Sequence, residues 1–153
     1  MRSQGSTWRI CGRLVLLAFA WGLAGCHARA VTAERIQGAI APTFANLVHL
    51  QLVHMGMPAV AASDLRVLAT CHKLDARTGA TGAGDWVCTL AWSCPGVRSS
   101  LRDVYEVSVR TDGCFTATAD GAESKVGGPM VTKRDGTEVT NLLYVFEGCF
   151  DTS

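Results

Sequence analysis

The stretch Asp85–Asp120 decides the fold: DWVCTLAW (85–92), SCPGVRSS (93–100), LRDVYEVSVR (101–110), TDGC (111–114) and FTATAD (115–120). Two of these runs alternate between apolar and polar residues, which places the apolar side chains on one side of an extended strand. The apolar members are Trp86, Cys88, Leu90 and Trp92 in the first run, and Leu101, Tyr105, Val107 and Val109 in the second. This alternation predicts half-buried strands of an antiparallel sheet.

Two Asp-Gly dipeptides separate strand-like runs in this half of the chain. Asp112-Gly113 follows the run 101–110, and Asp135-Gly136 lies between residues 130–133 and 137–139. Asp-Gly is typical of tight hairpin turns in which both central residues have positive φ. The sequence therefore predicts two hairpins.

An amphipathic helix is predicted before the sheet. Thr32 is a suitable N-cap, Glu34 lies in the first turn, and Gly56 and Pro58 end the helix. Pro42 has no N–H and is expected to kink or split the helix near residues 38–41. The apolar positions recur at helical spacing: Ile36, Ile40, Phe44, Leu47, Val48, Leu52 and Met55.

The predicted fold class is therefore α+β. One kinked or split N-terminal amphipathic helix packs on an antiparallel sheet of about four to five strands. A signal-peptide helix precedes this domain, and the helix is expected to act as the cover of the sheet.

The first 26 residues have the composition of an export signal. Arg2, Arg9 and Arg13 precede the apolar run 14–23, which is shorter than the ~20 residues that span a bilayer. The following residues LAGC (23–26) resemble the lipobox of bacterial lipoproteins. This resemblance implies acylation of the Cys26 thiol and cleavage before Cys26. An ordinary secretory signal that contains a cysteine remains the alternative.

The expected organisation is a signal peptide (1–25), a short tether (26–31) and a single extracytoplasmic domain (32–153). Without residues 1–25, 11 basic side chains face 13 acidic ones, a net charge of −2. No basic run remains, so nucleic acid is not an expected partner. The expected partners are the membrane, through lipidated Cys26, and an envelope protein. The expected location is the extracytoplasmic face of the bacterial cell membrane.

Five cysteines follow Cys26, and that many in a small domain suggest an oxidising compartment if the chain is exported. Their number is odd, so they cannot all pair with one another. Cys88 and Cys94 are six residues apart along a predicted strand, too far for a disulfide unless the strand folds back at once. We favour disulfides Cys71–Cys88 and Cys114–Cys149, with Cys94 free. Other connectivities remain open from the sequence.

No metal site, cofactor or catalytic residue is expected. The cysteines lack the paired spacing of a zinc site, and His49 and His54 face different sides of the predicted helix. The glycine-rich residues 77–85 lack the Gly-Lys-Ser/Thr of a phosphate-binding loop. The remaining histidines, His27 and His72, are dispersed.

The order of these features resembles that of small actinobacterial lipoproteins of unknown function. The features are the lipobox, the helix, Cys71, the glycine-rich loop, DWVCT (85–89) and the alternating strand, over residues 23–120. The resemblance implies a helix packed on a cysteine-tied antiparallel sheet and a place at the membrane. Cys94 and the tail beyond Asp120 lie outside it, and these families have no established activity.

The favoured function is that of a non-catalytic interaction or accessory lipoprotein of the cell envelope. One alternative is a binding module for a small envelope ligand, which needs a pocket between helix and sheet. Another is a cysteine-dependent enzyme, in which Cys94 would meet His49 or His72 and a carboxylate in one cleft. Histidines that lie apart would favour the interaction protein.

The lipobox resemblance predicts the fate of Cys26 directly. Replacing Cys26 by Ser is expected to abolish incorporation of a labelled fatty acid and to leave an unprocessed precursor, because the acylated thiol is lost. Metabolic labelling followed by electrophoresis measures both. A wild-type protein that takes up no acyl label and is found free in the medium contradicts the prediction.

Overall fold

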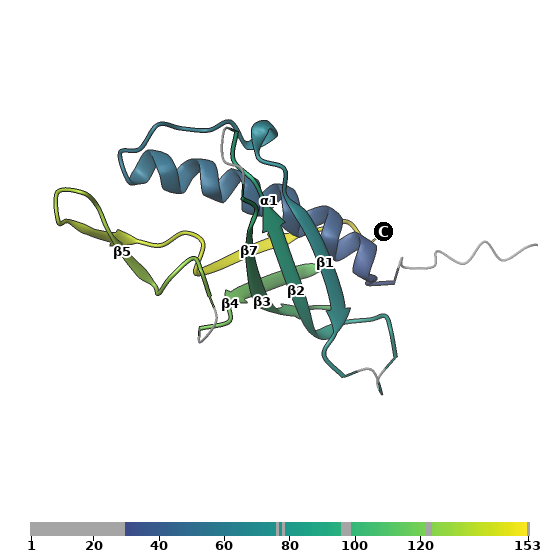
Figure 1. Ribbon diagram of the computed structural model, residues 1–153. Coiled ribbons are helices and arrows are strands. Elements are labelled where there is room, and N and C mark those ends of the chain that lie inside the picture. The colour runs from purple at the N-terminus through teal and green to yellow at the C-terminus, as the bar shows by residue number, and fades with distance from the viewer. Residues whose placement is uncertain (1–29, 76, 78, 96–98, 122–123, 153) are drawn as a thin grey trace, which may run out of the picture.

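The computed structural model describes residues 30–75, 77, 79–95, 99–121 and 124–152, so the signal segment 1–25 and Cys26 lie outside it. One long helix packs on an antiparallel sheet, in an α+β fold as predicted (Figure 1). The elements are α1 (Ala33–His54), the short 3₁₀ helix η1 (Ala62–Asp64), β1 (Leu68–Lys73), β2 (Gly84–Trp92), β3 (Leu101–Val109), β4 (Cys114–Ala119), β5 (Met130–Thr132), β6 (Glu138–Thr140) and β7 (Val145–Cys149).

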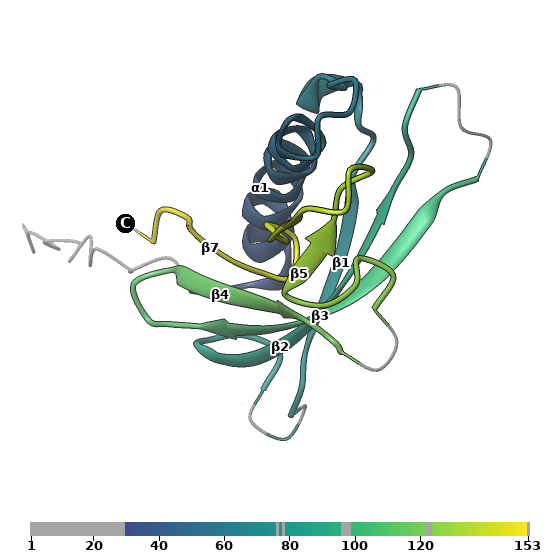
Figure 2. The ribbon, with the colours of Figure 1, turned by 90° about the vertical axis from the view of Figure 1, so that its left-hand side faces the viewer.

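The main sheet has five strands in the order β1-β2-β3-β4-β7, with every neighbouring pair antiparallel. β5 and β6 form a separate two-stranded hairpin, as the second Asp-Gly dipeptide predicted. Figures 1 and 2 show α1 against one face of the main sheet and the hairpin projecting beyond the body. No helix in the described part of the chain is long and apolar enough to cross a membrane.

α1 begins as the sequence predicted and runs unbroken through Pro42. Thr32 Oγ1 accepts a hydrogen bond from the Arg35 N–H and so caps the first turn. Pro42 removes the bond that Gly38 would otherwise accept, and both residues lie on the exposed side, where water can bond that carbonyl. The expected split is therefore absent, because the lost bond falls on the solvent side and the packed side is intact.

The centre of the core is an aromatic cluster around Phe44 of α1, which is fully buried. Its ring lies 4.8 Å from that of Trp92, 5.9 Å from that of Tyr105 and 6.2 Å from that of Phe146. These three side chains belong to β2, β3 and β7, so one helical side chain contacts three strands. Ile36, Ile40 and Val48 are also buried and Leu47 is half-buried, on the face that the periodicity predicted.

Both Asp-Gly turns differ in type from the expectation. Within each turn only the glycine has positive φ, 81° at Gly113 and 86° at Gly136, and no non-glycine residue in the described chain has positive φ. The Arg110 N–H bonds to the Cys114 carbonyl across a three-residue loop, and Lys133 bonds to Thr137 in the same way. This is a type I turn followed by a left-handed glycine, in which the aspartate keeps ordinary backbone angles.

Buried polar side chains hold the segment that carries the β5–β6 hairpin. Asp103 is 2 % exposed, and its carboxylate accepts bonds from the Lys125 and Val126 N–H groups. Asn141 donates to the carbonyls of Val126 and Gly128. Tyr105 Oη donates to the Leu143 carbonyl, and Gln51 Oε1 accepts the Leu142 N–H. Side chains of β3 and α1 thus fix both ends of the hairpin.

The aromatic cluster predicts the stability effect of removing its central ring. Phe44→Ala is expected to lower the free energy of unfolding by about 3–5 kcal/mol, because it leaves a cavity between three strands. Urea unfolding with the disulfides intact measures the change. Asn46→Ala, two residues away on the exposed side of α1, is the control and is expected to change stability by less than about 0.5 kcal/mol. Equal effects of the two substitutions contradict the prediction.

Candidate functional site

The face of the main sheet opposite α1 carries no covering element in the described part of the chain, and we call it the outer face. Alternation along each strand sends every second side chain to it. Its side chains are Leu68, Thr70 and His72 of β1, Asp85, Val87, Thr89 and Ala91 of β2, Arg102, Val104, Glu106 and Ser108 of β3, Cys114, Thr116 and Thr118 of β4, and Val145, Glu147 and Cys149 of β7.

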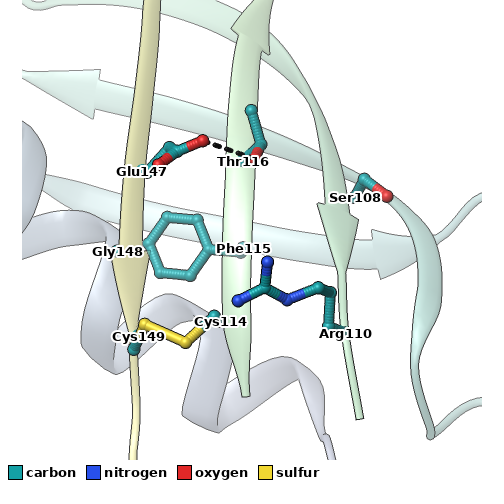
Figure 3. Close-up of a pocket in the computed structure, with 8 residues that line it drawn as sticks. All are labelled: Ser108, Arg110, Cys114, Phe115, Thr116, Glu147, Gly148 and Cys149. Carbon is teal, nitrogen blue, oxygen red and sulfur yellow. Dashed lines mark hydrogen bonds between the residues drawn. A yellow bond between two sulfur atoms is a disulfide. The ribbon is translucent and has the colours of Figure 1, made fainter. Parts of the chain in front are cut away.

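A shallow groove of about 340 Å³ crosses the outer face at the ends of β3, β4 and β7 (Figure 3). Thr116 Oγ1 donates to Glu147 Oε1 across the groove at 3.3 Å. Arg110 projects over its opposite end, beside the Cys114–Cys149 disulfide. The groove thus offers a cation, a carboxylate and hydroxyl groups on a rigid backbone.

The two disulfides lie on opposite faces of the sheet. Cys71–Cys88 joins β1 to β2 among buried residues under α1, with Cys88 0 % exposed. Cys114–Cys149 joins β4 to β7 on the outer face. Each pair occupies directly opposed positions that share no backbone hydrogen bonds, where facing side chains come closest. Both are the pairs favoured from the sequence, and Cys94 is the free cysteine.

Beneath the groove, on the inner face of the sheet, a glycine lies opposite a buried aromatic ring. Gly148 of edge strand β7 pairs with Phe115 of β4, and the Phe115 ring covers it (Figure 3). A Cβ at Gly148 would lie 2.6 Å from Phe115 Cζ, closer than two carbon atoms can approach. The missing side chain is therefore what allows the ring to lie flat against β7.

The turn at one end of the groove is held by a carboxylate. Asp112 Oδ1 accepts the Cys114 N–H at 3.0 Å, and Asp112 Oδ2 lies 3.3 Å from an Arg110 guanidinium nitrogen. The bond from the Cys114 N–H, followed by the Arg110 side chain, holds the pKa of Asp112 below its ordinary value of 3.8. This support of the turn is present at neutral pH and is lost as the pH falls through the lowered pKa.

A second groove, of about 320 Å³, adjoins the first and shares Ser108 and Thr116 with it. The strand register sets Asp85, Ser108, Thr116 and Glu147 in one row across four strands. Glu106 lies in the next row. The two grooves form one polar surface with carboxylates along it and Arg110 at its end.

The histidines and the free cysteine do not form a catalytic group. His49 Nδ1 donates to the Val60 carbonyl at 2.8 Å and ties α1 to the segment after it. His72 is exposed on β1, two strands and roughly 10 Å from Ser108. Cys94 packs half-buried against the core cluster. Within the described ranges, no group of three His, Cys, Asp or Glu residues could hold a metal ion.

The space between α1 and the sheet is filled by the aromatic cluster and its aliphatic neighbours. Both grooves lie on the outer face, whereas the binding-module hypothesis called for a pocket between the helix and the sheet. The alternation along β3 and β4 already indicated which residues share this face. It gave no indication that β7 adds Glu147 and Gly148, because that pairing joins strands distant in the sequence.

The contact between Gly148 and Phe115 predicts how the groove responds to one methyl group. Gly148→Ala is expected to lower the free energy of unfolding by about 1–3 kcal/mol, because the ring must leave its place. Gly128→Ala, where an added Cβ meets nothing within 4 Å, is the control in the same urea titration. Phe115→Leu in the Gly148→Ala protein is expected to restore part of the loss. If Gly148→Ala leaves the free energy of unfolding unchanged, the contact between Gly148 and the Phe115 ring is contradicted.

Comparisons of the chain with family models, with curated proteins and with solved structures find no match. The described part of the chain combines one long helix with a five-stranded antiparallel sheet, whose polar face opposite the helix is uncovered.

Proposed function

We propose that this protein is a membrane-anchored lipoprotein of the cell envelope whose domain acts as a non-catalytic interaction or accessory domain. Its contact surface is the outer face of the sheet. The observation that carries the proposal is the uncovered sheet face, which presents a rigid, mixed-charge surface with two adjoining grooves.

The chemistry of this face favours a polar protein partner. Asp85, Glu106 and Glu147 alternate with hydroxyl side chains, and Arg110 is 70 % exposed at one end. Transient protein–protein interfaces are about as polar as the rest of the protein surface. Charged side chains at their rims steer the partner during association. The complementary surface of the partner therefore carries basic side chains opposite the carboxylate rows.

The anchoring half of the proposal rests on LAGC (23–26), which follows the basic start and the apolar run 14–23. Cys26 stands where cleavage would leave it as the first residue, with residues 26–31 as a tether to the domain. Acyl chains on Cys26 would hold the domain at the extracytoplasmic face of the bacterial cell membrane.

A second candidate function is a binding module for a small envelope ligand. The groove beside Cys114–Cys149 favours it, because Arg110 lines one end of it and the Thr116–Glu147 pair lines the other (Figure 3). The cysteine-dependent enzyme has less support, since Cys94 packs against the core with neither His49 nor His72 bonded to it.

Charge reversal on the outer face tests the interaction proposal. A photoreactive amino acid at Thr118 is expected to capture a discrete protein in intact cells. Glu106→Arg is expected to lower the yield about tenfold or more, because like charges placed opposite each other cost several kcal/mol. Glu138→Arg on the β5–β6 hairpin is the matched control and leaves the yield unchanged.

Capture that is insensitive to Glu106→Arg contradicts the outer face as the protein contact. Two results together would favour the ligand-binding module instead. No protein adduct forms, and a small molecule protects Arg110 from chemical modification. Mass spectrometry of the adduct and of the modified arginine separates these results.

A further inference from the structure

The side of α1 that faces away from the sheet carries a continuous row of exposed, uncharged residues. Their positions differ by three or four, so they follow one line along the helix. We call this row the outer stripe of α1, and it consists of Gly38, Pro42, Asn46, Leu50, Val53 and Met57.

The apolar end of the stripe is substantially exposed. Leu50 is 50 %, Val53 54 % and Met57 41 % exposed. Met57 follows the helix, and its N–H bonds to the Leu52 carbonyl while the Gly56 N–H bonds to the Val53 carbonyl. This is a Schellman motif, which fixes Met57 beside the last turn. The three apolar side chains therefore belong to one ordered surface.

The stripe contrasts with the other large exposed surface of the domain. The outer face of the sheet carries Asp85, Arg102 and Glu106, whereas the stripe has no formal charge over about 20 residues. A surface helix normally sets charged residues on its solvent side, whereas this stripe is uncharged and ends in Leu50, Val53 and Met57. The sheet covers one side of α1, so a second apolar medium is indicated for the other.

The chain before α1 identifies that medium. Four residues separate Cys26 from Val31, and the five Cα–Cα steps between them span at most about 18 Å at full extension. α1 itself, with 22 residues, is about 33 Å long. The Gly82 N–H bonds to the Val31 carbonyl and holds the start of the domain in place. If Cys26 is acylated, α1 starts at the membrane surface.

We propose that the outer stripe of α1 rests on the phospholipid surface into which the acyl chains of Cys26 insert. The inference depends on the proposed lipid anchor. The domain then lies with α1 against the membrane and the outer face of the sheet directed away from it. Once the acyl chains hold the domain at the membrane, contact of the stripe with the lipid is effectively intramolecular. Three large apolar side chains are therefore enough to keep the stripe on the lipid surface. Placing the charged sheet face against lipid would instead bury charges.

Photo-crosslinking of the full-length protein in cell membranes that contain an alkyne-labelled phospholipid tests this orientation. A diazirine amino acid replaces Val53 in one variant and Val145 in the other. The two valines are 54 % and 45 % exposed, the first on the stripe and the second on the outer face of the sheet. Position 53 is expected to give about tenfold more phospholipid adduct than position 145, since an interfacial helix inserts its apolar side among the lipids.

A charge placed on the stripe provides a second measurement. With the probe at Met57, Leu50→Glu is expected to reduce the phospholipid adduct, whereas Leu68→Glu on β1 leaves it unchanged. Leu68 is 73 % exposed and lies on the outer face, so its replacement tests for a general effect of the added charge. Fatty-acid labelling of Cys26 is measured on the same samples.

Equal adduct yields at positions 53 and 145 in an acylated protein overturn the proposed orientation and leave the anchor intact. Capture of a second copy of the chain, or of another protein, at position 53 overturns it in favour of a protein contact. Absence of acyl label on Cys26 overturns the anchor itself, and the orientation with it.

Discussion

The ring of Phe44 is the contact on which the arrangement of helix and sheet depends. It touches aromatic side chains of β2, β3 and β7, and so it joins two inner strands to the edge strand β7 through one residue of α1. Tyr105 extends this contact, because its ring packs against Phe44 and Phe146 while its hydroxyl holds the Leu143 carbonyl. Burial, together with the nearby Asp103, raises the pKa of Tyr105, so the hydroxyl remains a donor. Core packing and hairpin placement therefore depend on the same side chain.

The two exposed faces of the domain differ in chemistry because they belong to different layers. The sheet has alternating strands, which leave a polar face when the other face is packed. α1 has only one packed face, yet its opposite side is uncharged from Gly38 to Met57. In the proposed orientation the helix layer lies between membrane and sheet. The polar face, with its two grooves, is then the surface left for a partner approaching from outside the membrane.

Much of the fold followed from local patterns. Alternation identified β2 and β3, helical periodicity identified the buried side of α1, and Asp-Gly identified both hairpins. The turn type was missed, since Asp-Gly also suits a three-residue loop in which only the glycine has positive φ. The burial of Asp103 was detectable from its position in the alternation of β3. The favoured Cys114–Cys149 disulfide placed the β4 and β7 segments together, but it did not indicate that Glu147 faces Thr116 in the groove.

The disulfide pairing has a consequence for the order of assembly. The two covalent loops, with sequence separations of 17 and 35, neither overlap nor interlock. If the chain is exported N-terminus first, as the proposed anchor requires, Cys71 and Cys88 arrive as the first pair within the domain, and these are native partners. The next thiol to arrive is Cys94, followed by Cys114. Pairing in order of arrival would join these two in a non-native disulfide. Packing of Cys94 against the core withdraws it from exchange. Correct oxidation of the second pair therefore depends on the folding of the first half of the sheet.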